Sequence, residues 1–206
     1  LHAARQIMAA YLAYPGENDG ELLRGYDKNV QEVTLPSGRT VSGEMCSRYP
    51  WRLAPYLGEQ VEELFLVNDN KKVTDTQRED SFEYQYRVSL YPALGLNAYC
   101  VGGYDDGANS GLFQSDVVTR MSQAFRPGNL IVFASARMRQ SGEMSMNDEE
   151  VPGNFLVRPP KFWRTKWSAR FDASKPASSF GNVAPRWDGR AVCAFLDGSV
   201  RTLDEK

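Results

Sequence analysis

The apolar positions at the start of the chain predict a helix. The residues that recur at three- and four-residue steps are Leu1, Ala4, Met8, Tyr11 and Leu12. This spacing places them on one helix face over residues 1–13, and the alanines between them favour helix. A Pro-Gly pair at 15–16 then ends the pattern.

Alternation of apolar and polar residues predicts strands farther on. Residues 31–43 read as a hairpin that turns at Pro36–Gly38. Phe82, Tyr84, Tyr86 and Val88 alternate with polar residues, which predicts a half-buried strand. The run LIVFASA at 130–136 is short, apolar and rich in β-formers, so we expect a central strand there.

The remaining segments give less regular signals. Two prolines limit residues 49–57 to short helical turns, and residues 115–125 resemble a short amphipathic helix capped by Ser115 or Asp116. Residues 139–185 are rich in Pro, Ser, Asn and charge, and predict a long loop-rich stretch on the surface.

The end of the chain predicts a hairpin of two short strands, 191–196 and 199–203. Asp197-Gly198 is a preferred pair for a two-residue type I′ turn, which needs positive φ at both central residues. Alternation then separates the side chains of the first strand onto two faces. Val192, Ala194 and Leu196 fall on one face, and Cys193 and Phe195 on the other.

This order of elements predicts an α+β fold, in which one N-terminal helix packs on an antiparallel sheet. The length of 206 residues fits a single domain, 1–206. We divide it into a helix remnant at 1–15, a loop-rich insertion at 139–185 and a C-terminal hairpin at 186–206.

Composition and charge narrow the functional classes. Apolar residues make up 42% and charged residues 24%, which is typical of a globular protein, and the net charge of −2 supplies no general attraction to nucleic acid. No run of eighteen apolar residues is present to span a bilayer. His2 is the only histidine, which removes most Ser-His-Asp, Cys-His and histidine-zinc mechanisms. We therefore expect no enzyme.

The three cysteines leave two interpretations open. Cys46, Cys100 and Cys193 form no metal-binding spacing, so they read as small apolar residues in the core. A Cys46–Cys100 disulfide is the alternative if the domain is exported, because oxidising compartments allow it.

Two surface segments carry candidate binding chemistry. The weak calcium candidates are Asp105, Asp106 and Asn109, although their spacing does not match a calcium loop and solvated turns are the simpler interpretation. Residues 158–171 interleave basic residues with aromatic ones, among them Phe162, Trp163 and Trp167. Such a mixture binds partners by stacking, or else its aromatic side chains dock on the sheet while the charges stay solvated.

Several segments, taken together and in order, resemble one protein family. They are ARQIMAAYLAYPGENDGELL, YPWRLAPYLG, LGLNAYCVGG, MSQAFRPGNLIVFASA and RWDGRAVCAFLDGSV. They are similar to type II secretion G-like pseudopilins and related prepilin-type proteins, whose C-terminal motif is His, nine residues, Asp-Gly. In this chain Trp187 replaces the histidine, and nine residues separate it from Asp197-Gly198.

The resemblance implies a structural protein. A leader and an apolar membrane segment would precede Leu1, and the domain would lie on the extracytoplasmic, periplasmic face of the cytoplasmic membrane. Its partners would be other pilin-like subunits and secretion-system components, contacted through the helix face of Leu1, Ala4, Met8 and Leu12. We expect no cofactor; the resembled family includes calcium-binding folds, but no motif of this chain aligns with the family's calcium ligands. Trp187 cannot titrate or bind metal as a histidine does, but its ring could cover the base of the hairpin.

A second function remains open from the residues. The chain would then be a membrane-anchored envelope binding module on a pilin-like scaffold. The insertion at 139–185 would hold a glycan or a protein through Phe162, Trp163 and Trp167.

Overall fold

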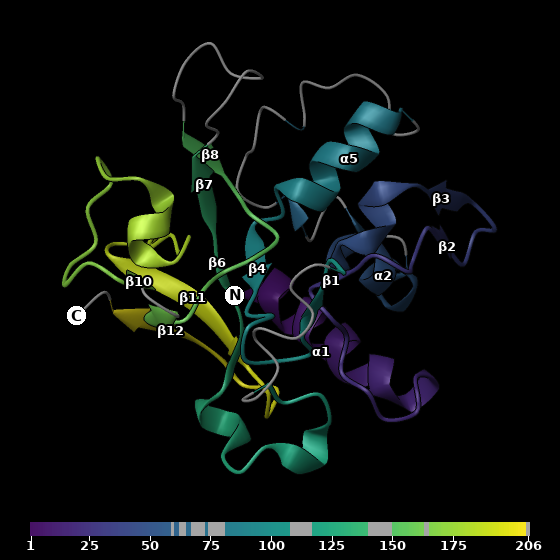
Figure 1. The fold of residues 1–206 in the computed structure, drawn as a ribbon, viewed down its shortest axis with the longest axis horizontal. Helices are drawn as coiled ribbons and strands as arrows, with labels where there is room; N and C mark the ends of the chain where they lie inside the picture. The colour runs from purple at the N-terminus through teal and green to yellow at the C-terminus, as the bar shows by residue number, and fades with distance from the viewer. Residues whose placement is uncertain are drawn as a thin grey trace.

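The chain folds as a mixture of helices and small, mostly antiparallel sheets, which confirms the α+β class (Figure 1). This computed structural model describes residues 1–58, 60–61, 65–66, 73, 81–107, 117–139, 150–162 and 165–204. The α-helices are α1 (His2–Ala13), α2 (Tyr49–Leu53) and α5 (Phe82–Leu90). The strands are β1 (Tyr26–Asp27), β2 (Glu32–Thr34), β3 (Thr40–Ser42), β4 (Leu94–Leu96), β5 (Tyr104–Asp105), β6 (Ile131–Ser135), β7 (Arg137–Arg139), β8 (Glu150–Pro152), β9 (Lys161–Phe162), β10 (Thr165–Lys166), β11 (Arg190–Phe195) and β12 (Val200–Asp204). The 3₁₀ helices are η1 (Tyr14–Glu17), η2 (Glu44–Ser47), η3 (Ala54–Leu57), η4 (Met121–Gln123), η5 (Pro127–Asn129) and η6 (Ala177–Phe180).

The main sheet has the strand order β12-β11-β6-β4, and its paired neighbours are all antiparallel. The predicted central strand LIVFASA is confirmed, because β6 lies between β11 and β4. The predicted C-terminal strands are confirmed as β11 and β12, and the predicted hairpin at 31–43 as β2 paired with β3. The short helical turns expected over 49–57 are α2 and η3.

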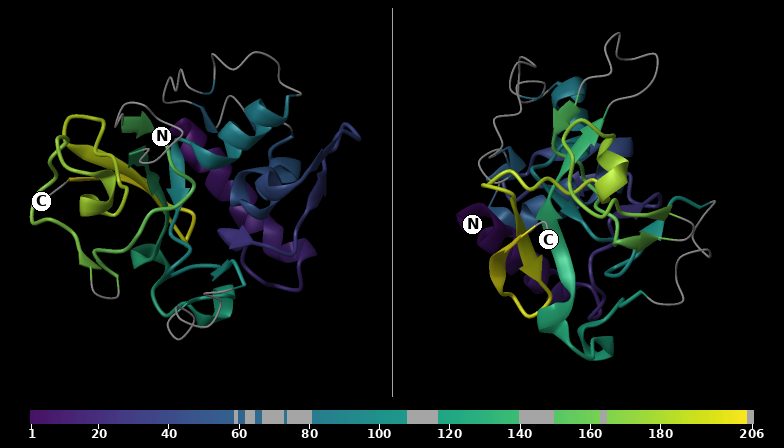
Figure 2. Two further views of the ribbon diagram at one scale, coloured as in Figure 1. Left: turned by 45° about the horizontal axis from the view of Figure 1, so that its top comes forward. Right: turned by 90° about the vertical axis from the view of Figure 1, so that its left-hand side faces the viewer.

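The two faces of β11 belong to two separate cores, as the alternation predicted. Val192, Ala194 and Leu196 pack in the larger core together with α1. Cys193 and Phe195 pack in a smaller core with Phe180 and Val183 from the insertion. Figure 2 shows α1 and the yellow-green segment that carries η6 on opposite sides of the sheet.

The insertion contributes to this second core, so the prediction of a surface loop over 139–185 is wrong for its described part. Val151, Val157 and Phe180 are buried. Arg137 on β7 is also buried and donates hydrogen bonds to Glu150 and to the carbonyl oxygens of Asp172, Ala173 and Lys175. Isolated apolar residues among Pro and Ser gave no periodic signal, although they are enough to anchor the segment.

The predicted strand over 82–88 is wrong, because these residues form the helix α5. The Oγ of Ser81 accepts a hydrogen bond from the Tyr84 amide at 3.1 Å and caps the helix. In a pattern that alternates with period two, residues four apart are of the same kind, and residues four apart also lie on one face of a helix. Accordingly, Tyr84 and Val88 are buried together, while Phe82 stacks on Tyr86 at the surface.

The predicted helix over 115–125 is also wrong where the structure describes it. Val118 and Arg120 form isolated bridges to Val101 and Glu21, and only η4 is helical. The proposed caps Ser115 and Asp116 lie outside the described residues. Within the described ranges, no helix combines the length and the apolar character needed to cross a bilayer.

Candidate functional site

The Asp197-Gly198 motif closes the β11–β12 hairpin, but not with the turn that we predicted. Gly198 has φ +87°, whereas Asp197 is not among the residues with positive φ. The Gly198 amide donates to the carbonyl of Phe195 at 2.9 Å, and the Phe195 amide donates to the carbonyl of Ser199 at 2.9 Å. These bonds describe a type I turn followed by a glycine bulge, which corrects the type I′ assignment.

The type I′ geometry occurs instead at the preceding Asp-Gly pair. Asp188 and Gly189 have φ of 53° and 72°, and the backbones of Trp187 and Arg190 exchange hydrogen bonds at 3.2 and 3.0 Å across them. The ring of Trp187 is 45% exposed and lines a pocket of about 550 Å³ with Leu1 and Val192. Trp187, the position at which the resembled family carries a histidine, therefore lies beside the start of α1.

The helix face predicted for subunit assembly is only partly accessible. Ala4 and Met8 are 2% and 0% exposed because they pack in the chain's own core, so in this conformation they are closed to a neighbour. Leu12 is half-buried against the same core, and Leu1 is exposed. Ala4, Met8 and, in part, Leu12 thus lie on the face that packs against the chain's own core, and of the four predicted assembly residues Leu1 alone stays exposed.

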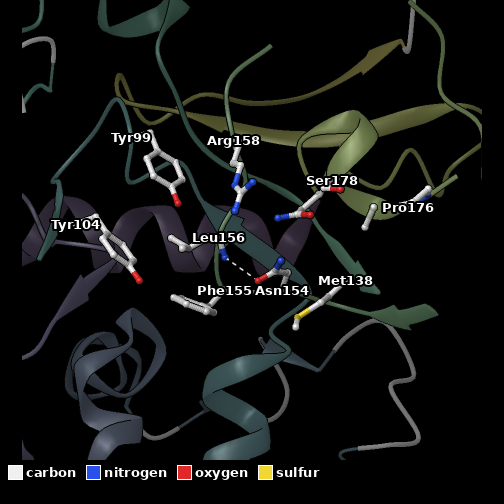
Figure 3. Close-up of a pocket in the computed structure, with 11 residues that line it drawn as sticks. Tyr99, Tyr104, Met138, Asn154, Phe155, Leu156, Arg158, Pro176 and Ser178 are labelled. Carbon is white, nitrogen blue, oxygen red and sulfur yellow. Dashed lines mark hydrogen bonds between the residues drawn. The ribbon is translucent and has the colours of Figure 1, made fainter. Parts of the chain in front are cut away.

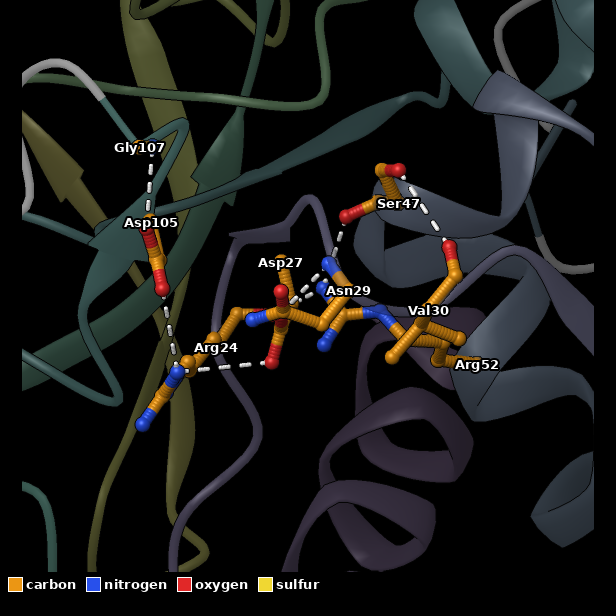
Figure 4. A network of polar contacts seen from close by, with 8 residues as sticks. All are labelled: Arg24, Asp27, Asn29, Val30, Ser47, Arg52, Asp105 and Gly107. Carbon is orange, nitrogen blue, oxygen red and sulfur yellow. Dashed lines mark hydrogen bonds and ion pairs between the residues drawn. The ribbon is translucent and has the colours of Figure 1, made fainter.

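The calcium candidate Asp105 is already engaged by the protein. Figure 4 shows Arg24 between Asp27 and Asp105, with Nη1 3.4 and 3.6 Å from the two carboxylates. The other oxygen of Asp105 accepts a hydrogen bond from the Gly107 amide at 2.9 Å. Asp106 is half-buried next to it, and Asn109 lies outside the described residues. Among the described residues no cluster of His, Cys, Asp and Glu is suited to a metal ion.

Arg52 lies under this ion-pair group and links it to the core (Figure 4). It is buried and donates from Nη2 to the carbonyl oxygens of Arg24, at 2.6 Å, and Ser47, at 3.0 Å. Desolvation by burial lowers its pKa to about 10, so it stays charged at neutral pH. The group holds β1, β5 and α2 together and serves the fold.

The aromatic residues of the basic segment at 158–171 fall into two groups, those outside the described residues and those that pack in the smaller core. Trp163 and the side chain of Phe162 lie outside the described residues. Trp167 is half-buried, and its ring centroid is 4.6 Å from that of Phe180 in the smaller core. Phe171 also contacts Phe180, edge-on at 5.6 Å. For Trp167 the docking interpretation is therefore confirmed.

A pocket that the sequence did not reveal lies between the β4–β5 loop and η6. Its volume is about 650 Å³. Figure 3 shows Tyr99 and Tyr104 on one side, Ser178 and Pro176 on the other, and Phe155 with Asn154 between them. Arg158 enters from the edge.

The tyrosine wall is a stack of rings from two chain segments. Tyr26 and Tyr104 are partners in the parallel β1–β5 pair, and their rings stack at 5.3 Å and 30°. Tyr99 stacks with Tyr104 at 6.1 Å and 18°. Burial raises the pKa of Tyr104 to about 12, with Tyr99 and Asp106 adding to the effect, so its hydroxyl is a hydrogen-bond donor at neutral pH.

Tyr99 and Tyr104 belong to the glycine-rich stretch at 94–107, where nothing in the sequence indicated a pocket. The opposite wall lies more than fifty positions along the chain, where no periodicity pointed back to the loop. Comparisons with protein families, with curated proteins and with solved structures found no match for the chain.

Proposed function

We propose that this chain is a structural subunit, the extracytoplasmic domain of a pilin-like protein from a type II secretion-like system. Its place would be the periplasmic face of the cytoplasmic membrane, with an N-terminal helix as anchor. Its partners would be other pilin-like subunits and secretion-system components, and its role requires no cofactor and no catalysis.

The packing of α1 on the β11–β12 side of the main sheet supports this proposal best. Ile7 and Tyr11 are buried in the larger core with Val192 and Leu196. The sheet's last two strands carry the Asp197-Gly198 turn that the resemblance rests on. A helix anchored in this way can transmit force from a membrane segment to the whole domain.

The surface available for assembly differs from the apolar stripe. Leu1, which precedes α1 as its N-cap, and Arg5 and Ala9 on α1 are exposed and four residues apart, so they form one outward-facing line. We therefore place the contact between subunits on this line and no longer on Ala4 and Met8.

Cysteine cross-linking in cells that produce the full-length protein tests the proposal. Ala9→Cys places a thiol on the exposed line, and a bismaleimide should then link subunits in the cytoplasmic-membrane fraction. Ala10→Cys is the matched control, because Ala10 is only 4% exposed and should give no linked species. The unsubstituted protein controls for the natural cysteines. A full-length protein that fractionates with the cytosol would refute the proposal.

A further inference from the structure

Two exposed apolar features of this domain lie at opposite ends of strand β11. We propose that they fit each other, so that Phe125 of one copy inserts into the pocket beside Trp187 of a second copy and joins the two head to tail. This inference rests on the filament role proposed above, and it adds a contact between the folded parts of neighbouring subunits.

The first feature is the segment at 117–130, which we call the Phe125 loop. Phe125 is 90% exposed, and Met121 on the same loop is exposed as well. The Oε1 of Gln123 accepts a hydrogen bond from the Arg120 amide at 3.0 Å and so fixes the backbone of the loop. A ring held in water by ordered backbone is the kind of aromatic anchor that protein interfaces bury.

The second feature is the pocket of about 550 Å³ beside Trp187, which we call the Trp187 pocket. Trp187 and Leu1 line it and are exposed, whereas Leu94 and Val192 line it and are buried. Its described lining carries no Asp, Glu, Lys or Arg, so the pocket suits an apolar side chain. A ring that entered it would cover the exposed parts of Trp187 and Leu1, and the removal of apolar surface from water favours association.

The distance between the two features requires a second copy. The Leu196 amide, directly after β11, donates to the carbonyl of Leu130 at 3.0 Å, so the Phe125 loop adjoins the turn end of the strand. Trp187 precedes the other end. Figure 1 shows the Phe125 loop at the bottom of the view, beyond the turn of the β11–β12 hairpin. A six-residue strand spans about 20 Å, so Phe125 cannot fill the pocket of its own chain.

Helix α1 gives this pairing a direction. Leu1 lines the Trp187 pocket together with Val192, and Leu12 near the end of the helix lies beside Gly198 in the hairpin turn. The helix therefore runs along β11 from the pocket towards the Phe125 loop. A contact between two different surfaces is heterologous and can repeat from copy to copy, whereas a two-fold contact closes after two copies. Repetition along the helix is what a filament requires.

Charge complementarity favours the same pairing. Arg126 follows Phe125, and its guanidinium lies 5.5 Å from the ring centroid without an ion pair or hydrogen bond to any described residue. Asp188 follows Trp187 and is exposed, and its carboxylate has no such partner in the described part of the chain either. Insertion of Phe125 brings these two neighbours together across the contact. An exposed pair of this kind fixes register and partner choice more than affinity.

Cross-linking between two tagged copies of the full-length protein in cells tests the inference. Ser122→Cys marks the Phe125 loop of one copy, and His2→Cys marks the pocket of the other, since both positions are exposed. A short bismaleimide should link the two tags in one species. Ser122→Cys copies alone should give little linkage. Ser42→Cys, an exposed position on β3, is the matched control and should not link to His2→Cys.

Side-chain variants identify the groups that hold the contact. Phe125→Ser in the Ser122→Cys copy should lower the doubly tagged species about tenfold or more, because the ring is the apolar anchor. Phe82→Ser removes another exposed phenylalanine and should leave the yield unchanged. Neither variant should lower the melting temperature by more than a few degrees, because both rings lie at the surface.

The charged pair has its own test by rescue. Arg126→Glu should lower the linked yield more than Arg126→Gln does, because it places two carboxylates together. Asp188→Asn in the partner copy should bring the Arg126→Glu yield back to that of Arg126→Gln. Asparagine suits this position because it tolerates the positive φ of residue 188.

Three results would overturn the inference. They are a yield that Phe125→Ser leaves unchanged, equal linkage of Ser122→Cys copies with each other, and no doubly tagged species under conditions in which Ala9→Cys copies link. The last result leaves the filament proposal standing and removes only this contact. A cytosolic protein that does not link through Ala9→Cys would refute the filament, and this contact with it.

Discussion

The ring of Tyr11 on α1 meets the ring of Phe133 on β6 edge-on, with centroids 5.4 Å apart and planes at 87°. Both side chains are fully buried. The Tyr11 hydroxyl also donates to the carbonyl of Leu23 at 3.2 Å. This pair joins the helix to the central strand, and burial raises the pKa of Tyr11 so that it remains a neutral donor.

Two substitutions of Tyr11 should separate the contribution of its ring packing to stability from that of its hydroxyl hydrogen bond. Tyr11→Phe keeps the ring contact and leaves the Leu23 carbonyl without this donor, so we expect a loss of about 1 kcal/mol in the free energy of unfolding. Tyr11→Ala also removes the ring and should cost about 3–5 kcal/mol. Urea denaturation measures both. Equal losses for the two variants would show that the ring does not hold α1 on the sheet.

Any side chain at position 198 should destabilise the C-terminal hairpin, because Gly198 forms its bulge. Gly198→Ala forces alanine into φ +87° and brings its Cβ to 3.3 Å from Leu12, so we expect a loss of about 1 kcal/mol or more. Gly16→Ala is the matched control, because its Cβ meets nothing within 4 Å and its φ is not positive. It should be neutral or slightly stabilising. Thermal denaturation compares the two.

The Arg137 side chain should hold the 171–175 segment in place. It is 2% exposed, lies 4.6 Å from the ring centroid of Phe171 and pairs with Glu150 at 2.5 Å. Arg137→Met removes its bonds to Glu150 and to three carbonyls, and should cost about 3 kcal/mol. Limited proteolysis should then cut near Asp172. The exposed Arg170→Met serves as the control, and an equal cleavage rate in both variants would contradict the role of Arg137.

Asp197 should make the hairpin sensitive to acid. Hydrogen bonds from the Ser199 hydroxyl, at 2.6 Å, and amide, at 2.9 Å, hold the pKa of this carboxyl below its ordinary value. A carboxyl whose pKa is lowered by folding stabilises the fold above its unfolded pKa. That contribution is lost as the pH falls through the folded pKa.

Ser199→Ala should therefore raise the Asp197 pKa toward the ordinary value in a carboxyl ¹³C NMR titration, and make the loss of stability in acid shallower. Ser174→Ala alters the equivalent pair with Asp172 and should leave the Asp197 signal unchanged. A Ser199→Ala titration that overlays the unsubstituted one would show that the hydroxyl does not set this pKa.

The thiols should differ in reactivity. None of the three cysteines is disulfide-bonded, so the Cys46–Cys100 disulfide is not formed in this structure. Burial raises the pKa of Cys46 to about 11 and that of Cys193 to about 12, whereas Cys100 is half-buried. Iodoacetamide followed by mass spectrometry should label Cys100 first and the other two only on unfolding. Early labelling of Cys193 would contradict the packing of β11.

Segments whose sequence pattern fits only one structure were predicted correctly, whereas segments whose pattern fits two structures were not. The faces of β11 and the position of β6 followed from alternation and from an apolar run, because a strand in a two-sided core has few other arrangements. Phe82–Val88 failed because the same residues also satisfy helical spacing, and only the Ser81 cap decides between the two. The turn at Asp197 failed because Asp-Gly suits both a type I′ turn and a type I turn with a bulge, and the loop length decides.

The candidate pocket could not be predicted from local patterns in the sequence. Tyr104 and Arg158 come together only because β1 pairs with β5 and η6 packs behind β11. No residue near Tyr104 or near Arg158 in the sequence indicates that these two side chains lie in the same pocket. The charged candidates Asp105 and Asp106 stood out in the sequence, yet Asp105 pairs with an arginine that no spacing rule linked to it.

The order of strands in the main sheet has a consequence for biosynthesis. Helix α1 leaves the ribosome long before β11, a strand of the sheet on which it packs, because the two elements are far apart in the sequence. Tyr11 lacks its contact with Phe133 until β6 is made, and the buried face of α1 lacks β11 for longer still, because contacts between such distant segments form slowly. A nascent chain would therefore expose an apolar helix face until these strands are made, which favours early binding of that face by a chaperone or a lipid surface.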